Sequence, residues 1–180
     1  MKQETYQTPI GIVKFPKTKI GDKEHGVIFV PAGYKEDDTA SWKFQLVFDP
    51  KTKQAKELLD ILNAEHNKIK GANFNPTKKD LSKNDAGDMV ETGLVAINFT
   101  SGYPPKMVDA ELNPCNVKIG WGSKIRVKFT IKPVNNKGKV GLGRYTRLIQ
   151  VIDPKELGIN TDGFEKEEGF VVDTSLDFKD

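Results

Sequence analysis

One segment of this 180-residue chain carries the apolar period of an α-helix, and β-strand signals lie on both sides of it. In residues 52–70 apolar positions recur at three- and four-residue steps, with Thr52 placed as N-cap and Gly71 as C-cap. Strand signals occupy residues 10–15, 27–30, 41–49, 91–100, 106–110, 123–132 and 144–152. Strands, one helix and then more strands predict a mainly β fold: a small antiparallel barrel with an inserted amphipathic helix, rather than repeated βαβ units.

Length and composition favour one folded domain followed by a tail. The apolar set AVILMFWYC makes up 37% of the chain, which is enough to bury a core. We expect the domain to span residues 1–157 and its polar segment 72–90 to form a long loop. Residues 158–180 show no period, and we expect them to form a disordered acidic tail.

Several classes of function find no support in the sequence. No run approaches 18 apolar residues, so no membrane span is expected, and the first residues lack the apolar core of a secretion signal. Cys115 is the single cysteine, which excludes intrachain disulfides and a cysteine-cluster metal site, and His25 and His66 suggest no catalytic triad with it. We therefore expect a soluble intracellular protein that is not an enzyme and uses no metal or cofactor.

Charge is distributed unevenly along the chain. Residues 161–180 contain seven acids and two lysines, a net charge of −5, whereas the formal net charge of the whole chain is +3. Residues 112–152 contain nine basic residues and no Asp or Glu. A field of one sign attracts polyanions, and a detachable acidic end is often an interaction tail. The tail is therefore predicted to lie over the basic surface until a stronger polyanion displaces it.

The segment 123–132 carries the strongest chemical signal. Ile125, Val127, Phe129 and Ile131 alternate with a row that contains only basic residues and Thr130. Side chains on one strand face repeat about every 7 Å, which is comparable to the spacing of phosphates along a single nucleic-acid strand. Aromatic residues before and after this strand add platforms on which bases stack, as in proteins that hold single strands without sequence choice.

Three segments of the C-terminal half resemble a known family. These are residues 119–133 (IGWGSKIRVKFTIKP), 135–138 (NNKG) and 148–153 (LIQVID). They resemble single-stranded-DNA-binding proteins of the OB-fold type from short-tailed bacteriophages, in which Gly-Ser precedes a basic strand and a Gly-rich hairpin leads to the final strand. A weaker resemblance extends over residues 5–155. Together these similarities imply a five-stranded OB-like barrel.

The resemblance implies a protein that coats and protects single-stranded DNA during phage replication and recombination, in the cytoplasm of the infected bacterium. Lys124, Arg126 and Lys128 are predicted to form the phosphate row, which further basic residues extend, and three aromatic residues are predicted to stack on bases. The extending residues are Lys106, Lys118, Lys132, Arg144 and Arg147, and the stacking residues are Tyr103, Trp121 and Tyr145.

The acidic C-terminal segment also resembles the acidic tails of this family. The resemblance implies that the segment recruits a polymerase, helicase-primase or nuclease and competes with DNA. Its predicted partner-binding residues are Glu165, Glu167, Glu168, Asp173, Asp177, Phe178 and Asp180. Two other classes of function stay open from the residues alone. One is an RNA-binding or strand-annealing protein, and the other is an adaptor whose basic face docks an acidic protein. A homodimer is also left open.

Overall fold

The computed structural model describes residues 4–156 and 168–169. The predicted disorder and partner-binding role of segment 158–180 therefore lie outside the described residues, apart from Glu168 and Gly169, which are exposed. The boundary between residues 157 and 158 stays a prediction.

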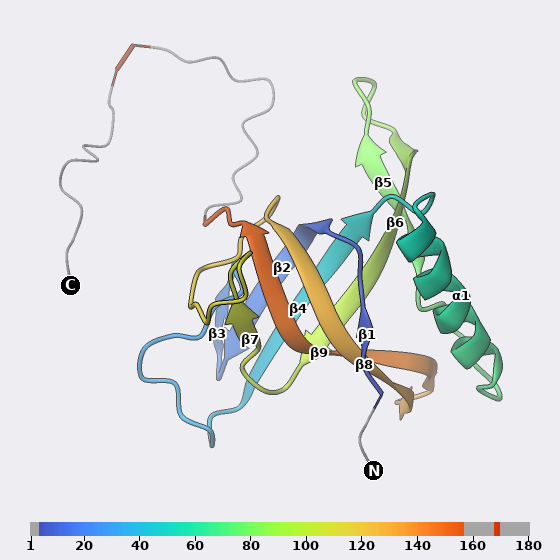
Figure 1. Ribbon diagram of the computed structural model, residues 1–180, viewed down its shortest axis with the longest axis horizontal. Helices are drawn as coiled ribbons and strands as arrows, with labels where there is room; N and C mark the ends of the chain where they lie inside the picture. Colours follow the sequence, from blue (N-terminus) through green and yellow to red (C-terminus); the bar gives the residue numbers. More distant parts are fainter. Residues whose placement is uncertain (1–3, 157–167, 170–180) are drawn as a thin grey trace.

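The described chain is mainly β structure with one α-helix (Figure 1). The helix α1 spans Lys53–Asn67. The strands are β1 (Tyr6–Gln7), β2 (Gly11–Ile20), β3 (Lys23–His25), β4 (Ala40–Phe48), β5 (Lys78–Lys83), β6 (Met89–Ser101), β7 (Lys106–Val108), β8 (Lys124–Asn136) and β9 (Lys139–Asp153).

Within the described residues, five strands close into a ring in the order β8, β2, β4, β6, β9 and back to β8. This arrangement confirms the predicted OB-like barrel with one helix. One neighbour pair differs from the expected antiparallel pattern, because β6 and β9 run parallel where Thr100 lies opposite Tyr145. In this ring β4 is separated from β8 by β2 and from β9 by β6, so its outer face points away from that of the β8–β9 pair.

The core forms on the inward faces of the strands, as the alternation predicts. In β4, residues 42, 44, 46 and 48 are all buried, and Trp42 donates a hydrogen bond from Nε1 to the Phe29 carbonyl at 2.8 Å. The Phe99 ring packs on Phe44 at 5.4 Å and on Phe129 at 4.9 Å between ring centroids. Trp42 therefore belongs to the core.

Strand β8 departs from the regular alternation predicted for it. Phe129 and Thr130 are both buried, although Thr130 was expected on the basic outer face. Lys128 pairs with Leu148 and Phe129 with Thr146, so Arg147 is an additional residue on β9. Such a bulge increases the local twist of the ribbon and re-aims the residues beyond it, which a period read from one strand does not reveal.

The helix confirms its predicted start and ends earlier than predicted. Thr52 is the N-cap, and its Oγ1 accepts a hydrogen bond from the Ala55 amide at 3.1 Å. The C-cap is Lys68 rather than Gly71. Ala55, Leu58 and Leu62 are buried in the core cluster, so the apolar stripe packs against the barrel as expected.

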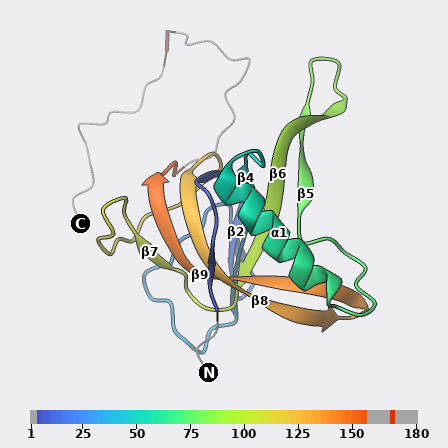
Figure 2. The ribbon, with the colours of Figure 1, turned by 45° about the vertical axis from the view of Figure 1, so that its right-hand side comes forward.

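Two predictions about local structure are wrong. Segment 72–90 is not a long loop, because it contains β5 and the start of β6, which form a hairpin that projects from the barrel (Figures 1 and 2). Its outer part is exposed on both faces, so its sequence is polar and lacks the alternation that marks a half-buried strand. Residues 27–30 are not a strand either; Ile28 is buried and makes an isolated bridge with Ile119.

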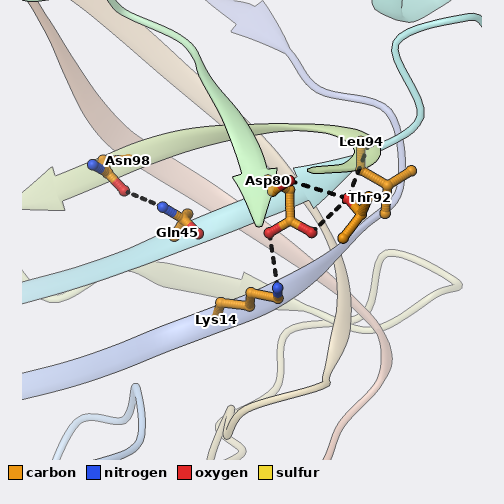
Figure 3. Close-up of polar contacts among 6 residues, drawn as sticks. All are labelled: Lys14, Gln45, Asp80, Thr92, Leu94 and Asn98. Carbon is orange, nitrogen blue, oxygen red and sulfur yellow. Dashed lines mark hydrogen bonds and ion pairs between the residues drawn. The ribbon is translucent and has the colours of Figure 1, made fainter. Parts of the chain in front are cut away.

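A buried ion pair ties the projecting hairpin to the barrel (Figure 3). Lys14 on β2 donates from Nζ to Asp80 Oδ1 on β5 at 2.8 Å, and the Asp80 side chain is 5% exposed. Thr92 on β6 donates from Oγ1 to the other carboxylate oxygen at 2.8 Å. Both oxygens of Asp80 are thus engaged by neighbouring strands, which fixes the base of the hairpin.

Candidate nucleic-acid interface

A groove of about 550 Å³ lies over the outer face of β4 and β6 and is bounded by the turn end of the β8–β9 hairpin. We call it the β4–β6 groove. The described residues that line it include no Asp or Glu. Its cationic and aromatic lining residues are Phe15, Lys17, Lys43, Phe44, Phe74, Phe99, Lys139, Arg144 and Tyr145.

Arg144 lines this groove and is tied to the neighbouring strand β6. Its Nε donates to the Asn98 carbonyl at 2.8 Å, and its guanidinium lies 5.9 Å from the centroid of the Phe74 ring. Burial lowers the pKa of the Arg144 guanidinium, which has an ordinary value far above neutrality. The Asn98 side chain in turn accepts a hydrogen bond from Gln45 at 3.2 Å, so a polar pair crosses from β4 to β6 (Figure 3).

Two glycines on β9 provide space for two aromatic rings. A Cβ on Gly141 would lie 2.5 Å from the Phe74 ring, and a Cβ on Gly143 would lie 2.7 Å from the Tyr145 hydroxyl and 2.8 Å from its ring. Both rings therefore rest directly against the strand backbone. Rings that are already ordered lose little conformational entropy when a base stacks on them.

We expect Gly143→Ala to weaken oligo-dT binding several-fold while leaving the free energy of unfolding nearly unchanged. The new methyl group would push the Tyr145 ring away from the strand, and a surface ring can swing outward without disrupting the core. Gly102→Ala is the matched control, because a Cβ there meets nothing within 4 Å. Fluorescence titration and urea unfolding measure the two quantities, and equal DNA affinity of both variants would contradict this role for Gly143.

The segment after α1 is fastened to the β8–β9 hairpin through one asparagine. The Asn73 amide donates to the Val140 carbonyl at 2.8 Å, and its Oδ1 accepts from the Val140 amide at 2.8 Å. Its Nδ2 also donates to the Gly138 carbonyl at 2.6 Å. These three hydrogen bonds hold Phe74 beside Arg144, although the two residues are far apart in sequence.

Phe15, which also lines the groove, projects from a bulge in β2. Its φ is +51°, a region that a bulky residue rarely adopts, and its side chain is 62% exposed. Pro16 follows it, and the register of β2 against β4 shifts between Lys14 and Lys17. The Phe15 ring meets the edge of Trp121 at 4.6 Å between centroids, so these two exposed rings continue the aromatic lining beyond the groove.

The residues predicted as one site divide between two surfaces. Arg144 and Tyr145 line the β4–β6 groove, and Trp121 borders it through Phe15. Other predicted cations lie on the outer face of the β8–β9 pair and its neighbour β7, where Arg126 is opposite Gln150 and Lys128 is opposite Leu148. We call this second surface the β8–β9 face; it consists of Lys106, Lys124, Arg126, Lys128, Leu148 and Gln150.

The remaining predicted residues line neither surface. Tyr103 is 77% exposed in the turn after β6, and Lys132 is exposed beyond the bulge in β8. Lys118 lies 5.7 Å from the centroid of the Phe29 ring. Arg147, the bulge residue, donates from Nε to Thr130 Oγ1 at 3.2 Å.

Sequence reasoning missed several residues of the groove. Phe15, Lys17 and Lys43 come from β2 and β4, outside the basic C-terminal half, and Phe74 comes from the segment expected to be a loop. One signal was present for Phe15, because proline inside a strand often marks a bulge. For Phe74 the signal was a lone aromatic residue in an otherwise polar segment.

Other chemical features of the described residues are limited. Within residues 4–156 and 168–169, no group of three or more His, Cys, Asp or Glu side chains is placed to hold a metal ion. Burial raises the pKa of the Cys115 thiol, which lowers the fraction of nucleophilic thiolate. No helix in the described part of the chain is long and apolar enough to cross a membrane.

The closed five-strand ring, the parallel contact between β6 and β9 and the groove over β4 and β6 are the features of an OB-like barrel. In OB folds this face is the one that binds oligonucleotides or oligosaccharides. The fold is similar to that of gp2.5, a single-stranded DNA binding protein encoded by bacteriophage T7, with a TM-score of 0.60 and 13% sequence identity. That match covers 96% of this chain and 100% of the other.

A second similar structure is the single-stranded DNA-binding protein of bacteriophage Enc34. Its form with a C-terminal truncation matches with a TM-score of 0.57 and 13% identity, over 84% of this chain and 87% of the other. Its complex with single-stranded DNA matches with a TM-score of 0.54, over 84% and 88%. No protein-family model and no curated protein matches this sequence. The resemblance predicted from the C-terminal half is therefore confirmed in the fold.

Proposed function

We propose that this protein binds single-stranded DNA without sequence preference. The observation that carries the proposal is the β4–β6 groove, where cations and aromatic rings gather with no acid among the described lining residues. Proteins that hold single strands combine these two elements, and base stacking on one ring contributes about 1–3 kcal/mol. The groove also lies on the face that OB folds use for oligonucleotides.

Each group in the groove has a distinct role. Lys17, Lys43 and Lys139 are exposed and contact phosphates, whereas Phe74 and Tyr145 stack on bases. Lys17 lies 3.6 Å from Glu24, but both side chains are half exposed and such a pair contributes little. Binding is independent of sequence because every base has a π-face and phosphates carry no sequence information.

The similarity in fold to phage single-stranded-DNA-binding proteins supports a proposal for the wider role. The protein coats and protects single-stranded DNA during phage replication and recombination in the cytoplasm of the infected bacterium, without catalysis or a cofactor. The row Lys124, Arg126 and Lys128 contacts phosphates of strands that are long enough to extend past the groove. Segment 161–180 competes with such strands for the basic barrel and recruits a polymerase, helicase-primase or nuclease. The charge contrast between the barrel and this segment supports the proposal.

Tryptophan fluorescence during titration with oligo-dT, duplex DNA and RNA tests the proposal. Trp121 is 38% exposed and touches Phe15, which lines the groove, while Trp42 is buried. We expect strong quenching by oligo-dT that weakens as salt rises, and little response to duplex DNA. Trp121→Phe should remove most of the quenching without removing binding in a gel shift.

Each alternative function gives a different outcome in this titration. RNA affinity equal to or greater than the DNA affinity would favour an RNA-binding or strand-annealing protein. Absence of binding to every nucleic acid, in both fluorescence and gel shift, would assign the basic surfaces to an acidic protein partner and would refute the proposal.

A further inference from the structure

A pair of amide side chains forms part of the floor of the β4–β6 groove. Gln45 of β4 lies directly opposite Asn98 of β6, and both side chains are half-buried and line the groove. Gln45 Nε2 donates to Asn98 Oδ1 at 3.2 Å (Figure 3). Residues directly opposite each other on one face of a sheet are close neighbours, so the strand register keeps the two amides together.

Each amide keeps one polar atom for a bound molecule. Gln45 Oε1 and Asn98 Nδ2 have no hydrogen-bond partner among the described residues, and neither atom is enclosed. An amide oxygen accepts hydrogen bonds and an amide nitrogen donates them. The floor of the groove therefore offers one acceptor and one donor side by side.

The polarity of this pair is reversible. An amide group has nearly the same shape after its oxygen and nitrogen exchange places, and its terminal torsion is broad. When both amides make half a turn, Asn98 Nδ2 donates to Gln45 Oε1, and the hydrogen bond between the strands is kept. The groove then contains a donor where Gln45 offered an acceptor, and an acceptor where Asn98 offered a donor.

The Watson–Crick edges of the four bases fall into two classes of opposite polarity. Adenine and cytosine carry a ring-nitrogen acceptor beside an amino donor, whereas guanine and thymine carry a ring N–H donor beside a carbonyl acceptor. Unpaired bases of a single strand can present this edge to a protein. The two orientations of the amide pair match the two classes of base.

The pair also lies beside the rings that are proposed to stack on bases. Arg144 donates from Nε to the Asn98 carbonyl at 2.8 Å, and its guanidinium lies 5.9 Å from the centroid of the Phe74 ring. Thr100, which shares the outer face of β6 with Asn98, lies opposite Tyr145. A base that stacks on either ring therefore lies over a floor that contains the two amides.

We propose that Gln45 and Asn98 form a reversible contact to the Watson–Crick edge of a bound base, which makes binding indifferent to base identity. A base edge that loses water without gaining a partner lowers affinity, and a contact of fixed polarity would favour one class of base. The reversible pair removes this penalty for both classes. The inference rests on the proposed function and explains how hydrogen bonding to bases is compatible with binding that ignores sequence.

Two double variants lock the pair in opposite polarities. Gln45→Glu with Asn98→Lys fixes an acceptor at position 45 and a donor at position 98, and Gln45→Lys with Asn98→Asp fixes the reverse. In both variants an ion pair replaces the hydrogen bond between the amides, and the net charge of the protein is unchanged. Each variant is therefore the matched control of the other.

Oligo-dC and oligo-dU of about four nucleotides, the lower limit for one OB fold, are the matched probes. Cytosine and uracil differ only in the groups along this edge, so phosphate contacts and ring size are the same. We expect the wild-type protein to bind both nearly equally, one double variant to prefer oligo-dC and the other oligo-dU, each by about 10-fold. Fluorescence titration and gel shift measure the affinities. A strong preference of the wild-type protein, or double variants that share one preference or show none, would overturn the inference.

A second test needs only the wild-type protein and keeps the inference testable if a double variant does not fold. Oligo-dT with a methyl group on each thymine N3 keeps its rings and phosphates but loses the donor of the Watson–Crick edge. We expect it to bind about 10-fold more weakly than oligo-dT. Oligo-dU, which lacks a methyl group away from this edge, is the control and should bind nearly as well as oligo-dT. Equal binding of methylated and unmethylated oligo-dT would overturn the inference.

Failure of this inference is distinguishable from failure of the proposed function. Wild-type protein that binds oligo-dT but tolerates N3 methylation would retain single-stranded DNA binding and exclude the role of the amide pair. Wild-type protein that binds no single strand in fluorescence or gel shift would overturn both.

Discussion

Reversing the charge of Lys17, Lys43 and Lys139 together is expected to weaken binding of a short oligo-dT by about 100-fold or more at low salt, because like charges then face the phosphates. All three side chains line the β4–β6 groove and are exposed. The slope of log K against log salt should also fall by about 2, since each phosphate contact on a single strand contributes about 0.7. Fluorescence titration at several salt concentrations measures both quantities.

The matched control reverses Lys106, Lys124 and Lys128 on the β8–β9 face. It changes the net charge of the protein by the same amount, so any general effect of net charge is equal in the two triple variants. Compared at physiological salt, this control should lose only a few-fold in affinity for the short oligonucleotide, because charges more than about 8 Å apart are largely screened there. A larger loss in this control than in the groove variant would place the short strand on the β8–β9 face.

Asp80→Ala is expected to lower the free energy of unfolding by about 3 kcal/mol, the lower end of the range for breaking a buried ion pair. Removing the carboxylate leaves the Lys14 ammonium, which is 21% exposed, without its partner, and removes the acceptor of the Thr92 hydroxyl. Urea unfolding monitored through buried Trp42 measures the change.

The same hairpin offers a matched exposed pair. Lys79 and Glu91 lie 3.1 Å apart with side chains that are 77% and 61% exposed, so Glu91→Ala should change the stability by less than about 1 kcal/mol. The double variant Lys14→Met with Asp80→Leu should recover much of the loss, because well-packed apolar residues can replace a buried pair. Equal effects of Asp80→Ala and Glu91→Ala would show that burial of the Lys14–Asp80 pair contributes nothing.

The elements predicted well from the sequence are those with one buried and one exposed face. Strand β4 shows four buried positions at period two, and α1 shows an apolar stripe that begins after Thr52. The hairpin of β5 and β6 was missed, because exposure of both faces in its outer part removes the alternation. Ile28 was assigned to a strand because it is apolar, whereas its burial comes from an isolated bridge to Ile119.

The candidate site was predicted in its chemistry but not in its arrangement. Basic residues with interleaved aromatics do line a groove, and Arg144 and Tyr145 are among them. The strongest row in the sequence, Lys124 to Lys128, faces a different side of the barrel. Phe15 and Phe74 complete the groove, but the bulge at Pro16 and the hydrogen bonds of Asn73 bring them there.

The sequence by itself determined the mainly β class, the single helix and the separation of a basic barrel from an acidic segment. It also determined which side chains of β4 point inward, and which of β8 do so up to Phe129. These properties depend on local periodicity and on composition, which can be read along the chain. The tertiary structure alone decided which outward faces became neighbours. Three such features depend on contacts between residues far apart in sequence. They are the closure of the ring between β6 and β9, the bulge at Arg147 and the hydrogen bonds between Asn73 and the β8–β9 hairpin. Because no local period encodes such pairings, the division of the basic residues into two separate surfaces became visible only in the folded barrel.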